Sequence, residues 1–267
     1  MTRRRWIADE YSDHDAALLG QNAAHLARVL RARVGQEYEI VCGGLVRLGT
    51  IASVSEERVE FALGGAMGDA MSDAIGERTG NATSGSGERE IVLVMAIYKF
   101  DRLEWAIEKC TELGATRIVP VIARRTEKHL AAAAGKRVER WRRIAHEAAQ
   151  QSRRVSPPRI DDAVNLKSAL AFDKSSNGTG DEKSANKKSA STRLLLNEKE
   201  RKKNLREALA EAAESIAFAV GPEGGWVDDE LALFDAEGWR SVTLGPRILR
   251  AETAAIAALA GIAAILD

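Results

Sequence analysis

Two different spacings of apolar residues divide the chain. Up to about Leu63, short runs alternate apolar and polar residues, as in EYEIVC, LVRLGTIASV and RVEFAL. Alternation with a period of two is typical of strands that bury one face, so these runs predict a small antiparallel barrel. Between them, NAAHLARVLRAR (residues 22–33) gathers its apolar residues on one side and predicts one helix.

After Glu90 the runs become longer and strands alternate with helices. EIVLVMAI is a continuous apolar run, which is typical of a strand buried on both faces, and RIVPVI follows as a second strand. The segment DRLEWAIEKCTELG predicts a helix that is capped by Asp101 and Glu104 and ended by Gly114. A second helix is predicted over 136–154, and its apolar face is formed by Val138, Trp141, Ala145 and Ala148.

The same alternation continues to the end of the chain. The runs RLLLN, SIAFAV and RSVTL predict strands, and NLREALAEAAE, DDELALFDAEG and ETAAIAALAGIAAIL predict helices. This order indicates an α/β fold with a mainly parallel sheet and right-handed crossovers. The last helix is apolar almost all round, so several of its sides must be covered, and a second subunit would cover them.

Composition places the domain boundary between the strand-rich first part and the later part in which strands and helices alternate. From Gly64 to Glu90 the chain is rich in Gly, Ser, Asn and Thr and cannot bury much apolar surface. At 267 residues two domains are expected. We therefore predict domains at 1–75 and 90–267, a linker at 76–89, and a low-complexity insert at 172–192.

Charge and cysteine content exclude several classes of protein. The chain has 39 basic and 39 acidic residues, so a nucleic-acid site would have to be a local patch. The two cysteines and four histidines show no metal-ligand spacing, and we expect no metal. The basic start lacks the apolar segment of a signal peptide, and the uncharged run from Thr253 to Leu266 is too short to cross a bilayer. We expect a cytoplasmic protein with no membrane partner.

The candidate chemistry lies in three loops that follow the last three strands. They are Asn197-Glu198, the GPEGG turn from Gly221, and the GPR turn from Gly245. In open parallel sheets, ligands bind outside the carboxyl ends of the strands. The phosphate-loop pattern GxxxxGK[ST] and the dinucleotide pattern GxGxxG are both absent. The glycines therefore predict close approach of the backbone to a neutral or zwitterionic ligand, with two ordinary strand-to-helix turns as the alternative.

Five motifs together resemble one known family. These are AVGPEGGW, TLGPRILRAETAA, KCTELGATRIVPV, AHEAAQQSRR and HLARVLRARVGQ. In their order they are similar to the bacterial 16S rRNA (uracil-N3)-methyltransferase family of the SPOUT superfamily, except over 64–90 and 172–192. The resemblance implies an N-terminal PUA-like β-barrel that binds RNA and a C-terminal SPOUT α/β domain with a trefoil knot. It also implies S-adenosyl-L-methionine as cofactor, 16S rRNA of the 30S subunit as substrate, and a homodimer.

The resemblance implies a cofactor pocket formed mainly by backbone groups of the glycine turns. The residues carried over are Leu196, Asn197, Gly221, Glu223, Gly224, Gly225, Leu244, Gly245, Ile248, Leu249, Arg250 and Thr253.

Three residues are candidates for catalysis. Uracil N3 carries a proton, so this proton must be removed before N3 can act as the nucleophile. Arginine stays protonated and can stabilise the uracil anion through a carbonyl oxygen, and we assign this role to Arg250. Glu252 or Glu223 could accept the proton if its pKa is tuned. Structural alternatives are that Glu252 caps the last helix and that Glu223 braces its turn.

Basic residues in both domains are candidates for phosphate contacts. They are Arg3, Arg4, Arg5, Arg28, Arg31, Lys99, Arg124, Arg125, Arg153 and Arg154. Since N3 lies on the Watson–Crick edge, the target uridine must be unpaired or flipped out. The sequence thus predicts an S-adenosylmethionine-dependent methyltransferase acting on N3 of a 16S rRNA uridine. The alternatives are a tRNA or rRNA 2'-O-methyltransferase of the same superfamily and a non-catalytic RNA-binding ribosome-assembly factor.

Overall fold

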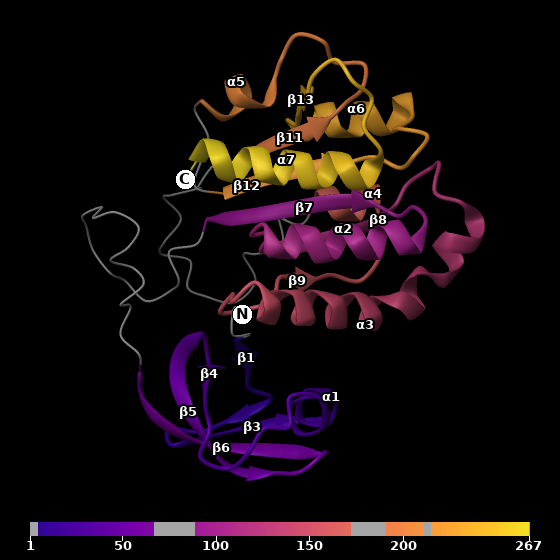
Figure 1. The fold of residues 1–267 in the computed structure, drawn as a ribbon. Coiled ribbons are helices and arrows are strands. Elements are labelled where there is room, and N and C mark those ends of the chain that lie inside the picture. Colours follow the sequence, from indigo (N-terminus) through magenta and orange to yellow (C-terminus); the bar gives the residue numbers. More distant parts are fainter. Residues whose placement is uncertain (1–4, 67–88, 172–190, 211–214, 267) are drawn as a thin grey trace, which may run out of the picture. The chain divides into compact units, whose positions relative to one another are not determined.

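The computed structural model describes residues 5–66, 89–171, 191–210 and 215–266 (Figure 1). Contacts divide the chain into two units, 1–87 with 149–156 and 88–148 with 157–267. The domain boundaries of the sequence analysis stay predictions. Most of the predicted linker (76–88) and insert (172–190) lies outside the described residues, as do Arg3 and Arg4.

The first unit is built on a curled six-stranded sheet. Its elements are β1 (Trp6–Ile7), β2 (Glu10–Tyr11), β3 (Asp15–Leu19), α1 (Gly20–Ala24), the π-helical turn η1 (His25–Val29), β4 (Glu37–Cys42), β5 (Leu45–Val54) and β6 (Arg58–Ala66). The strand order is β1-β4-β5-β6-β3-β2, and β1 and β2 follow each other in the chain. The two ends of the sheet are therefore neighbours, and Trp6, Leu18, Ile40, Ile51 and Phe61 fill its core.

The helical segment predicted over 22–33 instead spans 20–29. The helical turns end at Val29, and Arg31 has a positive φ of 50°. A left-handed residue cannot continue a right-handed helix, so the chain turns there. The amide of Ala32 then donates a hydrogen bond to the Leu26 carbonyl at 3.0 Å, which closes the end of the helical segment.

The second unit is an α/β fold in which every strand pair is parallel, which confirms the predicted class. Its elements are β7 (Glu90–Ala96), α2 (Phe100–Glu112), β8 (Arg117–Ile122), α3 (Lys128–Gln151), β9 (Arg159–Ile160), β10 (Val164–Asn165), α4 (Leu166–Leu170), β11 (Thr192–Leu196), α5 (Leu205–Leu209), β12 (Ser215–Val220), α6 (Asp228–Ala236), β13 (Arg240–Val242) and α7 (Ala251–Leu266). The order along the sheet is β10-β8-β7-β12-β11-β13, with β9 beside β8. The trefoil knot stays a prediction.

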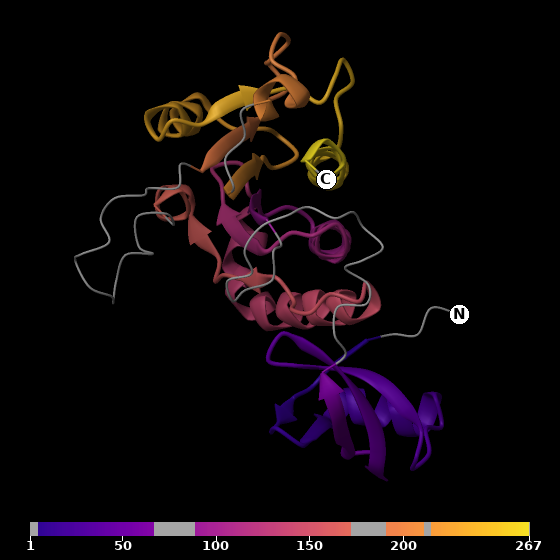
Figure 2. The same cartoon turned by 90° about the vertical axis from the view of Figure 1, so that its left-hand side faces the viewer.

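Helices cover both faces of the parallel sheet. Ile91, Leu93 and Met95 of β7 pack in one cluster with α2, α3, α5 and α7, whereas the alternate residues Val92 and Val94 pack with α4 and α6. Figure 2 shows α2 and α7 on one side of the sheet and α4 and α6 on the other. Burial on both faces explains why these strands read as continuous apolar runs.

Two predicted helix boundaries are wrong. The Lys99 carbonyl accepts the first hydrogen bonds of α2, so Lys99 takes the N-cap position and Asp101 lies inside the first turn without capping it. Gly114, with a φ of 100°, follows the end of this helix as expected. The helix predicted over 136–154 begins at Lys128 and ends at Gln151, so Arg154 lies beyond it. Its predicted apolar face is buried throughout. Within the described ranges, no helix has the length and apolar character needed to cross a membrane.

Candidate functional site

The loops after β11, β12 and β13 line a cavity of about 420 Å³ in the second unit. Parallel strands end at the same edge of a sheet, so loops distant in sequence meet there. Most of the lining comes from residues 196–199, 201, 220–223, 225–226, 242–245 and 247–251, and the start of α2 adds Lys99 and Arg102. Its volume lies in the range that holds a small molecule or cofactor.

Hydrogen bonds tie the first loop to the end of β13 and shape the third loop. The Asn197 amide donates to the Val242 carbonyl at 3.1 Å, which joins the first loop to the end of β13. In the third loop, the Gly245 amide donates to Oγ1 of Thr243 at 3.2 Å, and that hydroxyl donates to the Gly245 carbonyl at 3.0 Å. The cavity therefore has a defined wall of backbone groups.

Gly221 lies where no side chain fits. A Cβ atom built there would be 3.0 Å from Nε1 and 3.2 Å from Cδ1 of Trp226. Trp226 is itself backed by Phe234, with ring centroids 4.9 Å apart, and Phe234 packs on Trp239 at 5.2 Å. The aromatic rings behind the indole restrict its movement, so a side chain at Gly221 would press on Trp226, which also lines the cavity. Gly225 and Gly245 need glycine for another reason, since their φ angles are 71° and 115°.

A cation between two carboxylates forms the charged wall of the cavity. Nη1 of Arg102 lies 3.2 Å from Oε1 of Glu223 and 3.7 Å from Oε1 of Glu252. The Glu223 side chain is 41% exposed, but that of Glu252 is only 7% exposed. Oε2 of Glu252 has no hydrogen-bond partner within the described part of the chain. Arg102 thus carries the positive charge that a buried carboxylate needs.

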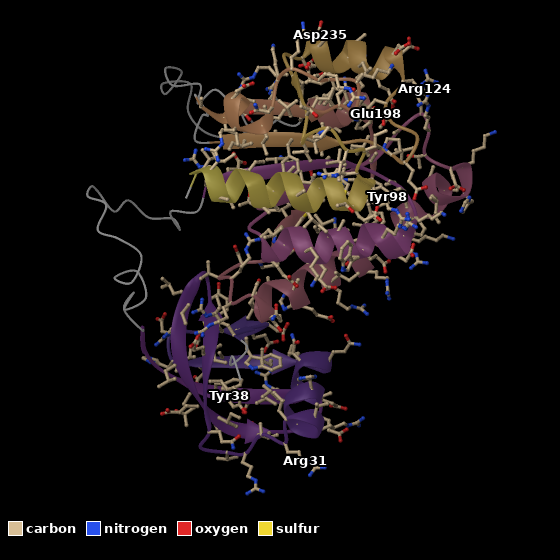
Figure 3. All side chains as sticks on the ribbon, turned by 45° about the horizontal axis from the view of Figure 1, so that its top comes forward. Arg31, Tyr38, Tyr98, Arg124, Glu198 and Asp235 are labelled. Carbon is tan, nitrogen blue, oxygen red and sulfur yellow. The ribbon has the colours of Figure 1, made fainter. Side chains whose placement is uncertain are left out.

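Tyr98, labelled in Figure 3, lies near this pair of carboxylates. Burial raises the pKa of Tyr98 well above 10, and the charges of Cys110, Glu252 and Glu223 raise it further. The phenol donates weakly to Sδ of Met95 at 3.5 Å. Tyr98 therefore stays neutral at any working pH and supplies no negative charge to the site.

The profile of one protein family, the RNA methyltransferase domain, matches residues 86–263. The chain belongs to this family. The match includes all three loops of the cavity, so the site described above lies within the RNA methyltransferase domain.

Named relatives of this RNA methyltransferase domain agree with the assignment. The chain is 36% identical over 173 residues to ribosomal RNA small subunit methyltransferase E of Rickettsia conorii, covering 64% of this chain and 62% of the relative. It is 38% identical over 184 residues to the Synechocystis protein of the same name, covering 66% of this chain and 54% of that protein. The matched part is thus less than two thirds of either relative.

A solved structure extends the likeness to nearly the whole chain. The crystal structure of ribosomal RNA small subunit methyltransferase E from Neisseria gonorrhoeae, bound to S-adenosyl methionine, is 27% identical with a TM-score of 0.74. The superposition covers 97% of this chain and 96% of that one. The two units of this chain therefore share the fold of that protein.

Most residues predicted for a cofactor pocket line the cavity of this RNA methyltransferase domain. They are Leu196, Asn197, Gly221, Glu223, Gly225, Leu244, Gly245, Ile248, Leu249 and Arg250. Gly224, Thr253 and the candidate base Glu252 are not among its lining residues. The Gly224 carbonyl instead accepts a hydrogen bond from Nη1 of Arg125, and Glu252 is buried behind Arg102.

Two arginines predicted to contact RNA are instead held by a carboxylate inside the first unit. Nε of Arg5 lies 3.0 Å from Oε2 of Glu39, and Arg153 binds the other oxygen of the same carboxylate. The Arg5 side chain is only 15% exposed. Burial alone would raise the pKa of Glu39, but the hydrogen bonds and charges of Arg153 and Arg5 outweigh it and lower that pKa. These two guanidinium groups therefore stabilise the unit.

The other predicted arginines have different surroundings. Arg28 is exposed and paired with Glu56, and Arg31 is exposed. Arg154 is half-buried. In the second unit, Lys99 lines the cavity, while Arg124 and Arg125 are exposed in the turn after β8. Of these predicted residues, Lys99 is the one that lines the cavity.

Five cavity residues with a cationic or aromatic side chain were absent from the sequence prediction. They are Arg102, Lys199, Arg201, Trp226 and Arg247. Trp226 and Arg247 belong to the quoted turns GPEGGW and GPR, so their position was a usable signal. Arg102 comes from another helix, and no local pattern places it at these loops.

Proposed function

We propose that this chain is an S-adenosyl-L-methionine-dependent methyltransferase that acts on N3 of a uridine in 16S rRNA. The observation that carries the proposal is the cavity at the carboxyl ends of β11, β12 and β13, within a domain of the RNA methyltransferase family. The names of the relatives and the ligand of the Neisseria protein support the substrate and the cofactor.

The residues present fit S-adenosyl-L-methionine. Gly221 lines the cavity beside Trp226 and has no side chain, so its backbone is what it offers to a ligand. Apolar lining from Leu196, Leu244 and Leu249 suits an adenine ring. We propose that these residues, with Asn197, Gly225 and Gly245, hold the cofactor, as the sequence predicted. When bound, the cofactor supplies a methyl group activated by a sulfonium.

Residues of this chain would help to remove the N3 proton of the uracil and would stabilise the resulting anion. Arg250 is exposed at the cavity, and its guanidinium would stabilise the uracil anion through a carbonyl oxygen. Glu223 lines the cavity and would accept the N3 proton, while the neighbouring Arg102 holds its carboxylate in place. Because Glu252 is buried and faces Arg102, we assign it the positioning of that arginine.

The target must reach the cavity as a single base. N3 of uracil is hydrogen-bonded in a base pair, so the uridine would be unpaired or flipped out before transfer. This requirement favours structured rRNA in a 30S subunit over a free nucleoside.

A homodimer would cover the last helix. Ala255, Ala258, Leu259 and Ile262 of α7 are buried against the rest of the unit, next to α2 in Figure 1. Other apolar residues of α7, including Ile256 and Ile265, are only partly buried. A second copy of the chain would bury them, as the sequence predicted for a helix that is apolar almost all round.

One experiment separates the proposed function from its rivals. The purified protein would be incubated with S-adenosyl-L-methionine carrying a labelled methyl group and with 30S subunits from a strain that lacks the gene. Nucleoside mass spectrometry would then identify the product.

The expected product is one 3-methyluridine per subunit. A labelled 2'-O-methyl nucleoside would refute the base-methylation proposal in favour of a ribose methyltransferase. Binding to 30S subunits with no methyl transfer would instead indicate an assembly factor. Equal rates on free uridine and on subunits would contradict the substrate.

A further inference from the structure

The first loop of the cavity is a turn built around one carboxylate. Oε1 of Glu200 accepts hydrogen bonds from three successive backbone amides, those of Arg201 at 2.9 Å, Lys202 at 2.7 Å and Lys203 at 3.2 Å. These backbone hydrogen bonds, first those of Lys202 and Lys203, lower the pKa of Glu200. The turn therefore keeps a defined shape at neutral pH although it lies on the surface.

Both ends of this turn are tied to the end of β13. Asn197 is joined to Val242 by its amide, and Nδ2 of Asn197 donates to Oγ of Ser241 at 3.3 Å. At the other end, the Thr243 amide donates to the Lys203 carbonyl at 2.9 Å. We call residues 199–203 the basic turn. It is held at the edge of the cavity rather than free to move away from it.

Most of the positive charges in the basic turn take no part in ion pairs within the described part of the chain. Lys199 lies 3.3 Å from Asp228, but Arg201, Lys202 and Lys203 are exposed and make no ion pair with any residue that the structure describes. Arg201 lines the cavity. The backbone of this turn is fixed by Glu200 and β13, so its three side chains are presented at one place, and Glu200 is the one carboxylate within the turn.

The lining of the cavity as a whole also has more positive than negative side chains. Its lining includes the six cations Lys99, Arg102, Lys199, Arg201, Arg247 and Arg250, against the two carboxylates Glu198 and Glu223. The proposed cofactor has a sulfonium, an ammonium and one carboxylate, so it is itself a net cation at neutral pH. A ligand that is itself a net cation does not account for the positive surplus. These charges therefore suit a second ligand, and a polyanion is the ligand that they fit.

We propose that the basic turn, together with Arg247, is a phosphate-binding edge that holds the RNA strand flanking the target uridine. This inference rests on the proposed function. A strand whose target base enters the cavity has its adjoining phosphates at the cavity mouth, where Arg201 and Arg247 line the wall. Phosphate contacts fix the position of a strand without reading its sequence, so this edge would place the base for transfer.

The test is a triple variant, R201Q/K202Q/K203Q, in the full chain. A matched control, K128Q/K136Q/R143Q, removes the same charge from exposed residues of α3 that do not line the cavity. Binding of a uridine-rich single-stranded oligoribonucleotide and of 30S subunits would be measured between 50 and 200 mM salt. Calorimetry with S-adenosyl-L-methionine would check the cofactor site of each protein.

The basic-turn variant should lose about 2 from the slope of log affinity against log salt, since each phosphate contact on a single strand contributes about 0.7. Between 50 and 200 mM salt, the wild-type protein should then weaken about 20-fold more than this variant. Its affinity for the cofactor should not fall, because the removed charges repel a cation. The α3 control should keep the wild-type slope.

Three results would overturn the inference. They are a wild-type slope in the basic-turn variant, an equal loss in the α3 control, and a loss seen with 30S subunits but not with the oligoribonucleotide. The last would indicate an acidic protein partner. Failure of the proposed function is a separate result, because the wild-type protein itself would then neither bind the cofactor nor methylate 30S subunits.

Discussion

Replacing Gly221 by alanine should weaken cofactor binding, because the added methyl group would meet the ring of Trp226. Its Cβ would lie 3.0 Å from Nε1 and 3.2 Å from Cδ1. Trp226 is 7% exposed and is backed by Phe234, so the ring has no free space behind it. The strain must therefore move the turn, which forms one wall of the cavity.

The size of the effect follows from the cost of overpacking. Forcing one extra carbon into a packed site typically costs about 1–3 kcal/mol. If the whole cost is borne by the bound state, the dissociation constant rises about fivefold to 150-fold. If it is borne by folding, the melting temperature falls by about 2–4 °C for each kcal/mol. Valine at Gly221 is larger and should abolish binding while the fold remains.

Calorimetric titration with S-adenosyl-L-methionine and thermal unfolding would measure the two parts. Gly135 of α3 offers a matched control, since an added Cβ there meets nothing within 4 Å. G135A should raise the free energy of unfolding by about 0.5–1 kcal/mol and leave cofactor affinity unchanged. In a double-mutant cycle, W226L should reduce the cost of G221A. Wild-type affinity together with a wild-type melting temperature in G221A would refute the steric argument.

Further predictions concern charged and titratable groups. R102Q should lower the free energy of unfolding by about 1–3 kcal/mol in chemical denaturation, because it leaves the buried Glu252 without its cation; an unchanged value would contradict the pairing. Burial raises the pKa of Cys110 to about 12, so its thiol should resist alkylation at pH 8 until the protein unfolds, as mass spectrometry would show. The pKa of Glu39 is lowered below its ordinary 4.5, so the stability that E39Q removes should be fully present above pH 4.5 and vanish as the pH falls below it. Equal losses for E39Q at pH 3 and pH 7 in denaturant titrations would argue against that ion pair.

Much of the fold could be predicted from the sequence because burial of an element requires a recognisable pattern of apolar residues along the chain. A strand buried on both faces must be apolar at every position, so SIAFAV and EIVLVMAI were recognisable, and each is buried along nearly its whole length. The glycine turns were also local, since Gly225 and Gly245 adopt angles that other residues avoid. Helix ends were less certain. Asp101 is of a residue type that often caps helices, but α2 already begins one residue earlier, at Phe100.

By itself, the sequence determined most of the longer strands, the loops that end the last three and the turns that need glycine, because these features depend on neighbours along the chain. It missed β3 and the two-residue strands β1, β2, β9 and β10, which leave little local pattern. Only the tertiary structure decided which charges meet. Arg102 joins Glu223 across 121 positions in the sequence. Arg5 is likewise joined to Glu39 across 34 positions. An ion pair depends on where folding brings two side chains, and no local pattern carries that information.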